Sequence, residues 1–249
     1  MKFQDKRFVV TGGASGIGYA VANQLIAEGG HVIITGRSKA PLEGAAQRLG
    51  PNAKPFLSDA GKLADIQSLI RFTEKTFGKL DGLFANAGVA IFGPLETVNE
   101  ETYDSIMTTN VKGVFFLLQQ AIPILNDGAS VVINASITGT KSRPTSVVYS
   151  ASKAAARSLT KGFAGALVGR NIRVNTVSPG PIDTPLWLKE GGMPKDMVEP
   201  LMQAVKESNP MKRFGTPEEV ANAVTFLLSG QSSYMTGAEI FVDGGVVNL

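Results

Sequence analysis

The sequence predicts an α/β protein built on a doubly wound parallel β-sheet of about seven strands, with helices on both faces. Along its 249 residues, short apolar runs alternate with longer amphipathic segments. The short runs are almost continuously apolar, which is typical of parallel strands that are buried on both faces. Right-handed crossovers between such strands place the amphipathic segments as helices above and below the sheet.

The first strand and the first helix set the pattern for the later elements. Residues 7–11 form an apolar run, and residues 16–28 carry Ile17, Val21 and Leu25 at helical spacing until two glycines end the segment. By the same criteria, further strands are expected at 31–35, 53–57, 80–85, 130–135, 172–177 and 239–242. Further helices are expected at 41–49, 60–77, 100–125, 147–168 and 217–228.

No charged linker or low-complexity stretch divides the chain, so residues 1–249 are predicted to form a single domain. Residues 185–209 are rich in methionine and proline and have only a weak helical pattern. Because methionine suits a flexible apolar cover, this segment is expected to form a lid over a binding site. Two ordinary amphipathic helices are the alternative.

The composition excludes several classes of function. The chain has no cysteine and a single histidine, His31, so disulfides, thiol catalysis, a metal site and a Ser-His-Asp triad are not expected. The net charge of +3 is spread along the chain without a basic run, so no nucleic-acid partner is expected. The apolar runs are too short to cross a membrane and no signal-peptide core is visible, so a cytoplasmic location is expected.

A tyrosine and a lysine four residues apart, Tyr149 and Lys153, fall within the helix expected at 147–168. At this spacing both side chains lie on the same face of a helix. A neighbouring ammonium group favours the phenolate and lowers the pKa of a tyrosine from about 10. The pair is therefore a candidate proton donor and acceptor near neutral pH, although many surface helices carry such a pair without any function.

A glycine-rich loop joins the first strand to the first helix. It contains Gly12, Ser15, Gly16, Ile17 and Gly18. Glycines allow a tight turn and a close approach of the backbone to a pyrophosphate, while the helix N-terminus offers unpaired N–H groups to the anion. In this strand-turn-helix context the loop predicts a dinucleotide site.

The second strand is followed by Arg37 and Ser38, where an NAD-binding fold would place an acid that accepts from the ribose 2′-hydroxyl. A guanidinium can instead pair with a 2′-phosphate, and Ser38 can add a hydroxyl donor. NADP(H) is therefore preferred over NAD(H). The alternative is that Arg37 is a solvated loop residue and that NAD binds without the acid.

Further motifs appear in a fixed order along the chain. They are Asn86-Ala87-Gly88 after the fourth strand, Asn110, Ser136 thirteen residues before Tyr149, Pro179-Gly180 with Thr184, and Asp243-Gly244-Gly245. With the glycine loop and the Tyr-Lys pair, they make essentially the whole chain resemble the short-chain dehydrogenase/reductase family, in its compact single-domain branch with a Rossmann fold. The chain departs from the family at Ala85, where many members have a second asparagine. It also departs at Ser15, where many NADP-using members have a basic residue.

The resemblance implies an enzyme that transfers hydride reversibly between NADP(H) and a ketone or secondary alcohol. It implies that Tyr149 is the general acid and base, that Ser136 hydrogen-bonds the same substrate oxygen, and that Lys153 holds the nicotinamide ribose and lowers the pKa of Tyr149. It further implies that Asn110 holds a water that links Lys153 to solvent. The cofactor-binding residues implied are Gly12, Ser15, Gly16, Ile17, Gly18, Arg37, Ser38, Asp59, Asn86, Ala87, Gly88, Tyr149, Lys153, Pro179, Gly180, Ile182 and Thr184.

The substrate walls are expected to be mainly apolar, which favours an apolar ketone or alcohol. The candidate residues are Ile91, Ile137, Arg143, Trp187 and Leu188. Arg143 could meet an acidic substrate group or lie on the surface. A reductase of 3-oxoacyl groups on an acyl carrier protein, a non-catalytic dinucleotide sensor and a sugar-nucleotide epimerase are alternatives. Family members are commonly tetramers, so a homo-oligomer is expected.

Overall fold

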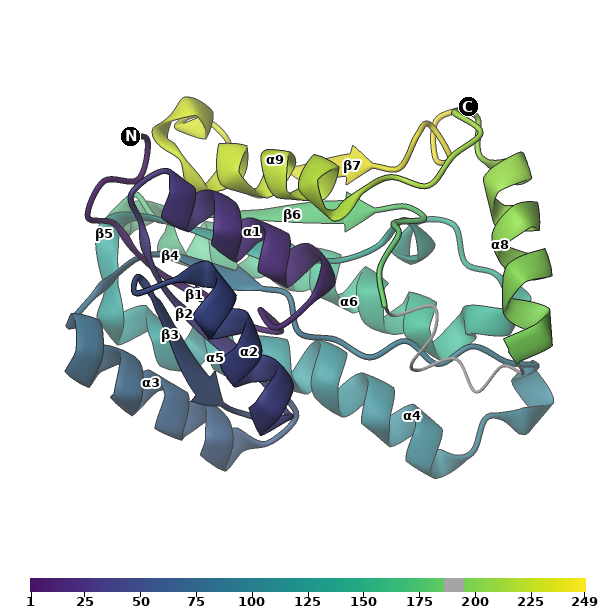
Figure 1. Ribbon diagram of the computed structural model, residues 1–249, viewed down its shortest axis with the longest axis horizontal. Coiled ribbons are helices and arrows are strands. Elements are labelled where there is room, and N and C mark those ends of the chain that lie inside the picture. Colours follow the sequence, from purple (N-terminus) through teal and green to yellow (C-terminus); the bar gives the residue numbers. More distant parts are fainter. Residues whose placement is uncertain (186–194) are drawn as a thin grey trace.

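The computed structural model describes residues 1–185 and 195–249 (Figure 1). Its centre is a parallel sheet of seven strands in the order β3-β2-β1-β4-β5-β6-β7. The strands are β1 (Arg7–Val10), β2 (His31–Gly36), β3 (Ala53–Leu57), β4 (Leu80–Ala85), β5 (Leu125–Asn134), β6 (Arg173–Pro179) and β7 (Glu239–Val242). The doubly wound parallel sheet predicted from the sequence is confirmed.

Helices cover both faces of the sheet. They are α1 (Gly16–Ala27), α2 (Lys39–Leu49), α3 (Leu63–Phe77), α4 (Glu100–Met107), α5 (Val114–Ala121), α6 (Val147–Leu167), α8 (Lys195–Ser208) and α9 (Pro217–Leu228). Helices α1, α2 and α9 pack on one face, and α3, α5 and α6 pack on the other. No helix in these two described ranges is long and apolar enough to span a membrane.

The two faces of the sheet bury separate apolar cores, which explains why the strands are continuously apolar. In β1, Phe8 and Val10 belong to the core under α1 and α9, whereas Val9 belongs to the core under α3 and α5. Successive side chains of a strand point to opposite faces. A polar residue at either position would be buried and would need a hydrogen-bond partner, so apolar residues predominate in the interior strands.

The chain reverses its direction of winding between β1 and β4. Strand β1 pairs with β2 on one side and with β4 on the other, so the carboxyl ends of β1 and β4 diverge into connections that run to opposite faces. In open α/β sheets this switch point is where ligands bind. The order of the strands alone therefore predicts a ligand site at the carboxyl ends of β1 and β4.

The helix expected at 100–125 is interrupted. Helix α4 passes into a π-helical turn at Thr108–Gly113 before α5 begins, and a 3-10 turn at Ile122–Ile124, which contains Pro123, ends it. A Cβ atom on Gly113 would lie 2.1 Å from the carbonyl oxygen of Ala60, so this turn packs directly against another backbone segment. Such π-turns are rare and are frequent at functional sites. This one buries Asn110.

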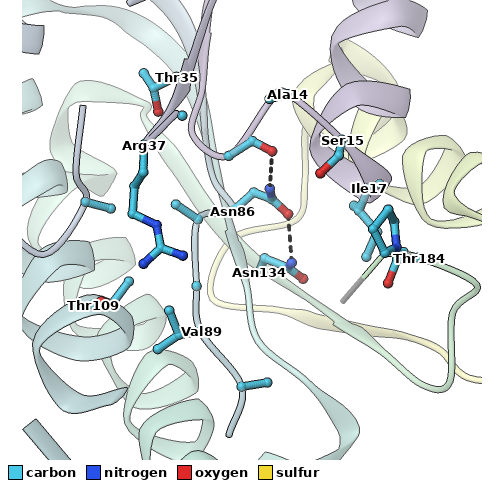
Figure 2. Close-up of a pocket in the computed structure, with 18 of the residues that line it drawn as sticks. Ala14, Ser15, Ile17, Thr35, Arg37, Asn86, Val89, Thr109, Asn134 and Thr184 are labelled. Carbon is cyan, nitrogen blue, oxygen red and sulfur yellow. Dashed lines mark hydrogen bonds between the residues drawn. The ribbon is translucent and has the colours of Figure 1, made fainter. Parts of the chain in front are cut away.

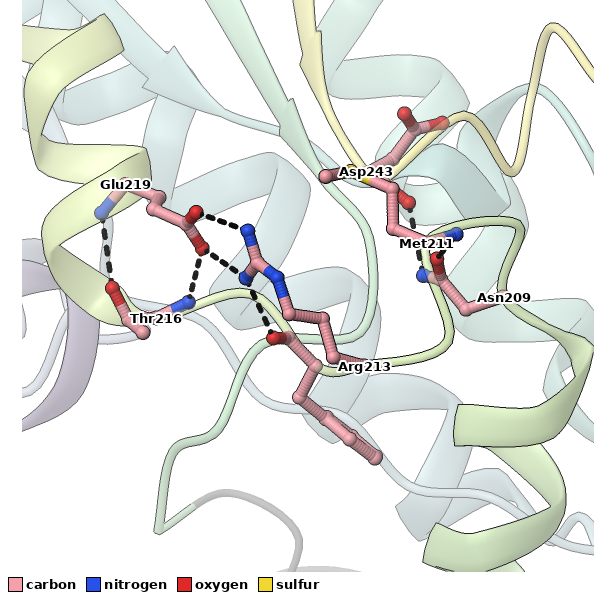
Figure 3. A network of polar contacts seen from close by, with 7 residues as sticks. Asn209, Met211, Arg213, Thr216, Glu219 and Asp243 are labelled. Carbon is pink, nitrogen blue, oxygen red and sulfur yellow. Dashed lines mark hydrogen bonds and ion pairs between the residues drawn. The ribbon is translucent and has the colours of Figure 1, made fainter.

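A polar network joins the end of α8 to α9 and to the C-terminal loop (Figure 3). Asn209 Nδ2 donates to the carbonyl oxygen of Asp243 at 3.2 Å. Arg213 pairs with Glu219 through both terminal nitrogens, at 2.8 and 2.6 Å. Thr216 and Glu219 also form a capping box at the start of α9. The network therefore fixes the connection that follows α8.

Glu219→Gln is expected to lower the free energy of unfolding at pH 7 by about 1 kcal/mol, a modest loss because both ion-pair side chains are partly exposed. The hydrogen bond from Arg213 lowers the pKa of Glu219 from 4.5 to about 2. A carboxyl whose pKa is depressed on folding stabilises the protein above its ordinary pKa, and this stabilisation is lost as pH falls through the folded value. Thermal melts should show a Tm difference of about 2–4 °C at pH 7. The difference should shrink between pH 4.5 and pH 2. Equal Tm values at pH 7 would show that the Arg213–Glu219 ion pair does not stabilise the fold.

Candidate active site

A cleft of about 350 Å³ opens at the carboxyl edge of the sheet, over the switch point between β1 and β4 (Figure 2). It is bordered by the glycine loop, the ends of β2 and β5, the segments after β3, β4 and β6, and one face of α6. The predicted site residues that border it are Gly12, Ser15, Gly16, Ile17, Arg37, Ser38, Asp59, Asn86, Ala87, Gly88, Tyr149, Lys153 and Thr184.

The glycine loop fits the close approach of a phosphate group. Gly12 and Gly16 have backbone φ angles of 65° and 53°, which residues with a side chain rarely adopt. A Cβ on Gly18 would lie 2.2 Å from the carbonyl oxygen of Gly12, so this glycine serves the packing of the loop rather than the cleft wall. Ser15 precedes α1 without capping it by a side-chain hydrogen bond. The first N–H groups of α1 therefore lack a side-chain cap from Ser15, as an anion site requires.

Asn86 ties the end of β4 to the glycine loop. Its backbone N–H and that of Ala87 donate to Thr11 Oγ1 at 2.9 and 3.0 Å, and its Nδ2 donates to the carbonyl oxygen of Thr11 at 2.9 Å. A Cβ on Gly88 would lie 3.1 Å from Asn110 Oδ1. The Asn-Ala-Gly segment therefore forms a rigid floor between the glycine loop and the π-helical turn.

Arg37 and Asp59 lie at the end of the cleft away from α6. The Arg37 side chain extends from the end of β2 toward Thr109 and Val89 (Figure 2). Asp59 Oδ1 accepts from the backbone N–H of Gly61 at 2.9 Å, so its carboxylate is fixed at the start of the next connection. A cation and an anion thus stand at this end of the cleft, about where the adenosine part of a dinucleotide would lie.

Lys153 lies on α6 at the opposite end of the cleft. Its ammonium donates to the carbonyl oxygen of Asn134 at 2.8 Å and lies 5.7 Å from the centre of the Tyr149 ring. Burial lowers the pKa of Lys153 from 10.5 to about 8. The lysine therefore titrates close to neutral pH.

Tyr149 differs from expectation in the direction of its pKa. Burial raises the pKa of the phenol to about 12, and a hydrogen bond with Ser136 opposes this shift. The expectation of a lowered Tyr149 pKa is wrong for this structure, because the loss of hydration on burial outweighs the opposing hydrogen bond. The phenol is a proton donor over the whole neutral range. The edge of the Phe92 ring packs against Tyr149 with centroids 5.6 Å apart.

Hydrogen bonds from Thr138 orient the Ser136 hydroxyl toward Tyr149. Its Oγ accepts from the backbone N–H of Thr138 at 3.2 Å and from Thr138 Oγ1 at 3.1 Å. Since the oxygen is used as an acceptor, its hydrogen is left for the Tyr149 oxygen. The two hydroxyls are thus joined to each other by a hydrogen bond.

Asn110 is held by three hydrogen bonds, and the water link to Lys153 implied for it stays a prediction. Its Nδ2 donates to the carbonyl oxygen of Val89 and to Ser152 Oγ, and its Oδ1 accepts from the N–H of Val89, all at 2.9–3.0 Å. Both amide hydrogens are used, so they are not available to a water. The side chain joins the segment after β4 to α6.

The remaining cofactor candidates lie behind the cleft wall. Gly180 donates its N–H to Val242, and a Cβ at this position would lie 2.7 Å from Cα of Asp243. Ile182 is buried and forms a bridge with Gly215. Pro179 ends β6. Pro179 and Gly180 pack against β7 and the residue that follows it, and none of the three residues borders the cleft.

The substrate candidates are dispersed. Ile91 borders a separate cavity of about 60 Å³ next to Phe92. Ile137 is buried, whereas Arg143 is exposed at the start of the turn before α6. Trp187 and Leu188 lie outside the described residues. Arg143 therefore fits the surface alternative.

Sequence reasoning missed several residues of the cleft, of which Asn134 is the most connected. It ends β5, its carbonyl oxygen accepts from Lys153, and its Nδ2 donates to Asn86 Oδ1 at 2.9 Å. Ser58, Thr109 and Val89 also border the cleft. The sequence feature that could have identified Asn134 is its place at the end of a predicted strand, two residues before Ser136. Within residues 1–185 and 195–249 no group of His, Asp or Glu side chains could hold a metal ion.

Known proteins align with nearly the whole chain. A family model described as Enoyl-(Acyl carrier protein) reductase matches residues 12–247. An oxidoreductase of Sarocladium schorii is 39% identical over 246 residues, covering 98% of this chain and 96% of that protein. The NADP-dependent (R)-specific alcohol dehydrogenase of Lentilactobacillus kefiri is 36% identical over 251 residues, covering 98% and 97%. The 3-oxoacyl-[acyl-carrier-protein] reductase of Thermotoga maritima is 36% identical over 252 residues, covering 99% and 100%.

Solved structures agree with these relatives. A variant of a Serratia marcescens short-chain dehydrogenase/reductase superposes with a TM-score of 0.90 at 32% identity, covering 99% of this chain and 100% of that one. A metagenomic blue fluorescent protein in complex with NADPH superposes with a TM-score of 0.89 at 29% identity, covering 99% of both chains. Sequence, sheet order and cleft therefore agree, and the chain belongs to the short-chain dehydrogenase/reductase family of oxidoreductases.

Proposed function

We propose that this oxidoreductase uses NADP(H) in preference to NAD(H) to interconvert an apolar ketone and its secondary alcohol. The main observation in support of this proposal is that one continuous cleft is bordered by Arg37, which follows β2, and by Tyr149 and Lys153 of α6. A guanidinium suits a 2′-phosphate, and a phenol with its hydrogen in place suits a developing alkoxide. The NADP-dependent relative and the NADPH complex support this cofactor.

The residues of the cleft fit a dinucleotide. Gly12, Gly16 and the start of α1 would hold the pyrophosphate, since a side chain at either glycine would be strained or would fill this space. Arg37 and Ser38 would hold the 2′-phosphate, and Asp59 would face the adenine side. Lys153 would donate to the ribose hydroxyls next to the nicotinamide.

The bound nicotinamide would supply or accept the hydride. The protein's part is to hold the carbonyl oxygen and to give it a proton. Tyr149 would donate its hydrogen to that oxygen, and Ser136 would stabilise the negative charge as it forms. The charge of Lys153 would favour the phenolate left behind, because opposite charges attract strongly at a site shielded from water. Asn110 would keep α6 and the segment after β4 in register.

The pH dependence follows from Lys153. Its pKa is lowered to about 8, so the ammonium is charged below this pH and is lost as pH rises through it. kcat/KM for ketone reduction is therefore expected to be flat below about pH 8 and to fall above it, since this ratio reports the free enzyme. A pH series of initial rates measures it. A flat profile up to pH 10 would contradict a charged Lys153 in the reaction.

The substrate and the assembly are further parts of the proposal. The apolar ring of Phe92, which packs against Tyr149, supports an apolar substrate. An open apolar surface formed by Met107, Val111, Phe115 and Leu159 supports a homo-oligomer, which we take as a tetramer. We place residues 185–209 as a lid, with α8 as its described part. A cytoplasmic location stays a prediction.

Reduction of 3-oxoacyl thioesters is the second candidate. The Thermotoga maritima relative and the matching family model, both named for acyl-carrier-protein chemistry, favour it. A carrier protein would require a basic surface near the site, and among the described residues the exposed Lys141 and Arg143, which follow Ser136 in the chain, could contribute to it. A mere dinucleotide sensor is disfavoured because it needs no Ser136-Tyr149 pair.

A spectrophotometric screen at 340 nm tests the proposed function. NADPH and NADH are each combined with apolar ketones, sugars and acetoacetyl thioesters. The expected result is oxidation of NADPH with apolar ketones, at kcat/KM well above that with NADH. Turnover only with thioesters would select the second candidate. Tight nucleotide binding without turnover of any compound would contradict an enzymatic role.

A further inference from the structure

Two residues, Asn86 and Asn134, link the glycine loop to Lys153 through a series of hydrogen bonds. Asn86 Nδ2 donates to the carbonyl oxygens of Thr11 and Gly12, at 2.9 and 3.3 Å. Asn134 Nδ2 donates to Asn86 Oδ1 at 2.9 Å, and Lys153 donates to the carbonyl oxygen of Asn134 at 2.8 Å. Figure 2 shows Asn134 and Asn86 facing each other at the centre of the cleft wall.

The direction of these hydrogen bonds is forced. Asn86 faces two carbonyl oxygens, which only accept, so its NH₂ group must point toward them and its oxygen toward Asn134. Asn134 must then present its own NH₂ group to Asn86. A carboxylate at position 134 has no hydrogen to give, and an apolar side chain of the same size would leave the pair unmade.

The Asn134 amide is not explained by the stability of β5. The preceding residues Val131, Val132 and Ile133 are apolar and fully buried. Asn134 Oδ1 is itself buried and has no hydrogen-bond partner among the described residues. An unpaired buried acceptor is unfavourable, and such groups in folded proteins call for a functional explanation. Asn86 borders the cleft, as Asn134 does, so its oxygen could exchange a lost partner for water.

We propose, on the basis of the function proposed above, that Asn134 is a positioning residue that couples the phosphate-binding glycine loop to Lys153 and to Ser136. Its side chain holds Asn86, and through Asn86 it holds the loop. Its backbone oxygen holds Lys153, and the chain turns into Ser136 two residues later. The hydrogen bond between Asn134 and Asn86 therefore fixes the glycine loop at one end of the nucleotide site relative to Lys153 and Ser136 at the other.

The test compares Asn134→Leu and Asn134→Asp with a control in the next strand. Asn175 of β6 is fully buried, donates to the carbonyl oxygen of Met235 at 2.8 Å and accepts from the N–H of Ala238 at 3.0 Å, away from the cleft. The dissociation constant of NADPH is measured by fluorescence, and Tm by thermal melting. NADH replaces NADPH if it binds more tightly to the wild type.

The expected result is that both Asn134 variants bind the nucleotide about tenfold more weakly or worse. The Tm of Asn134→Leu should be unchanged or higher, because the unpaired oxygen is removed. Asn175→Ala should show the opposite pattern, with a lower Tm and an unchanged dissociation constant. In a double-mutant cycle, Asn86→Ala with Asn134→Leu should bind no more weakly than the weaker single variant, because both changes break the same link.

Three outcomes would overturn the assignment of Asn134. The first is that Asn134→Leu binds the nucleotide with a dissociation constant within twofold of the wild type. The second is that Asn134→Leu loses enough Tm to account for its weaker binding, and the third is that the two substitutions multiply each other's effect on the dissociation constant in the double variant. A wild type that binds the nucleotide but reduces no compound would overturn the proposed reaction alone. A wild type that binds neither nucleotide would overturn both.

Discussion

Replacement of Tyr149 by phenylalanine is expected to lower kcat by about 10²–10⁴-fold, the usual contribution of a positioned general acid. The phenol hydrogen-bonds Ser136 and has a pKa raised to about 12, so it carries its proton throughout the working pH range. Removal of the hydroxyl takes away this proton donor, while the ring keeps its edge contact with Phe92. Steady-state rates of ketone reduction measure the loss.

Binding and a distant tyrosine provide the controls for this prediction. The dissociation constant of NADPH should change by less than about threefold in Tyr149→Phe, because the lost interaction is made mainly in the transition state. Tyr103 on α4 is 49% exposed, and Tyr103→Phe should retain full activity. If Tyr149→Phe retains a rate within tenfold of the wild type, the proton comes from another group.

Replacement of Arg37 by aspartate is expected to reverse the choice of cofactor. The ratio of kcat/KM for NADPH to that for NADH should fall by about 10²-fold or more, because a guanidinium-phosphate pair is lost and a carboxylate repels the phosphate. The same carboxylate can accept a hydrogen bond from the ribose 2′-hydroxyl of NADH. The ratio is measured with one ketone and both nucleotides.

Lys39 is the matched control for Arg37. It lies two residues further along the chain as the first residue of α2, is exposed, and pairs with Glu43 at 3.9 Å. Lys39→Ala should leave the ratio within about twofold, since a solvated ion pair of this length contributes little. An unchanged ratio in Arg37→Asp would show that Arg37 does not read the 2′-phosphate and that the cofactor preference has another origin.

Much of the fold was predictable because each buried strand is a short apolar run closed by turn residues. Strands β3, β4 and β7 and helix α9 begin and end at the residues expected from the sequence. The π-helical turn at Thr108–Gly113 was not predictable, since it depends on the approach of Gly113 to the Ala60 backbone. The early start of β5 at Leu125 was missed because Asn126, Asp127 and Gly128 are not typical strand residues.

The candidate site was also predictable in part. Motif spacing placed Gly12, Arg37, Tyr149 and Lys153 in one cleft, because strand ends and helix faces are local features. The direction of the Tyr149 pKa was wrong, since helical spacing says nothing about how far the phenol is removed from water. Asn134 was missed because its role depends on a partner 48 residues away.

The most direct test of the account is the fate of deuterium from NADPH deuterated at both C4 positions. The purified protein is incubated with this nucleotide and a ketone selected by the 340 nm screen, and the alcohol is analysed by mass spectrometry. The account predicts one deuterium per molecule, on the carbinol carbon, with the alcohol formed in amounts equal to the nucleotide oxidised. An alcohol without deuterium, or no alcohol from any ketone while the nucleotide stays bound, would contradict it.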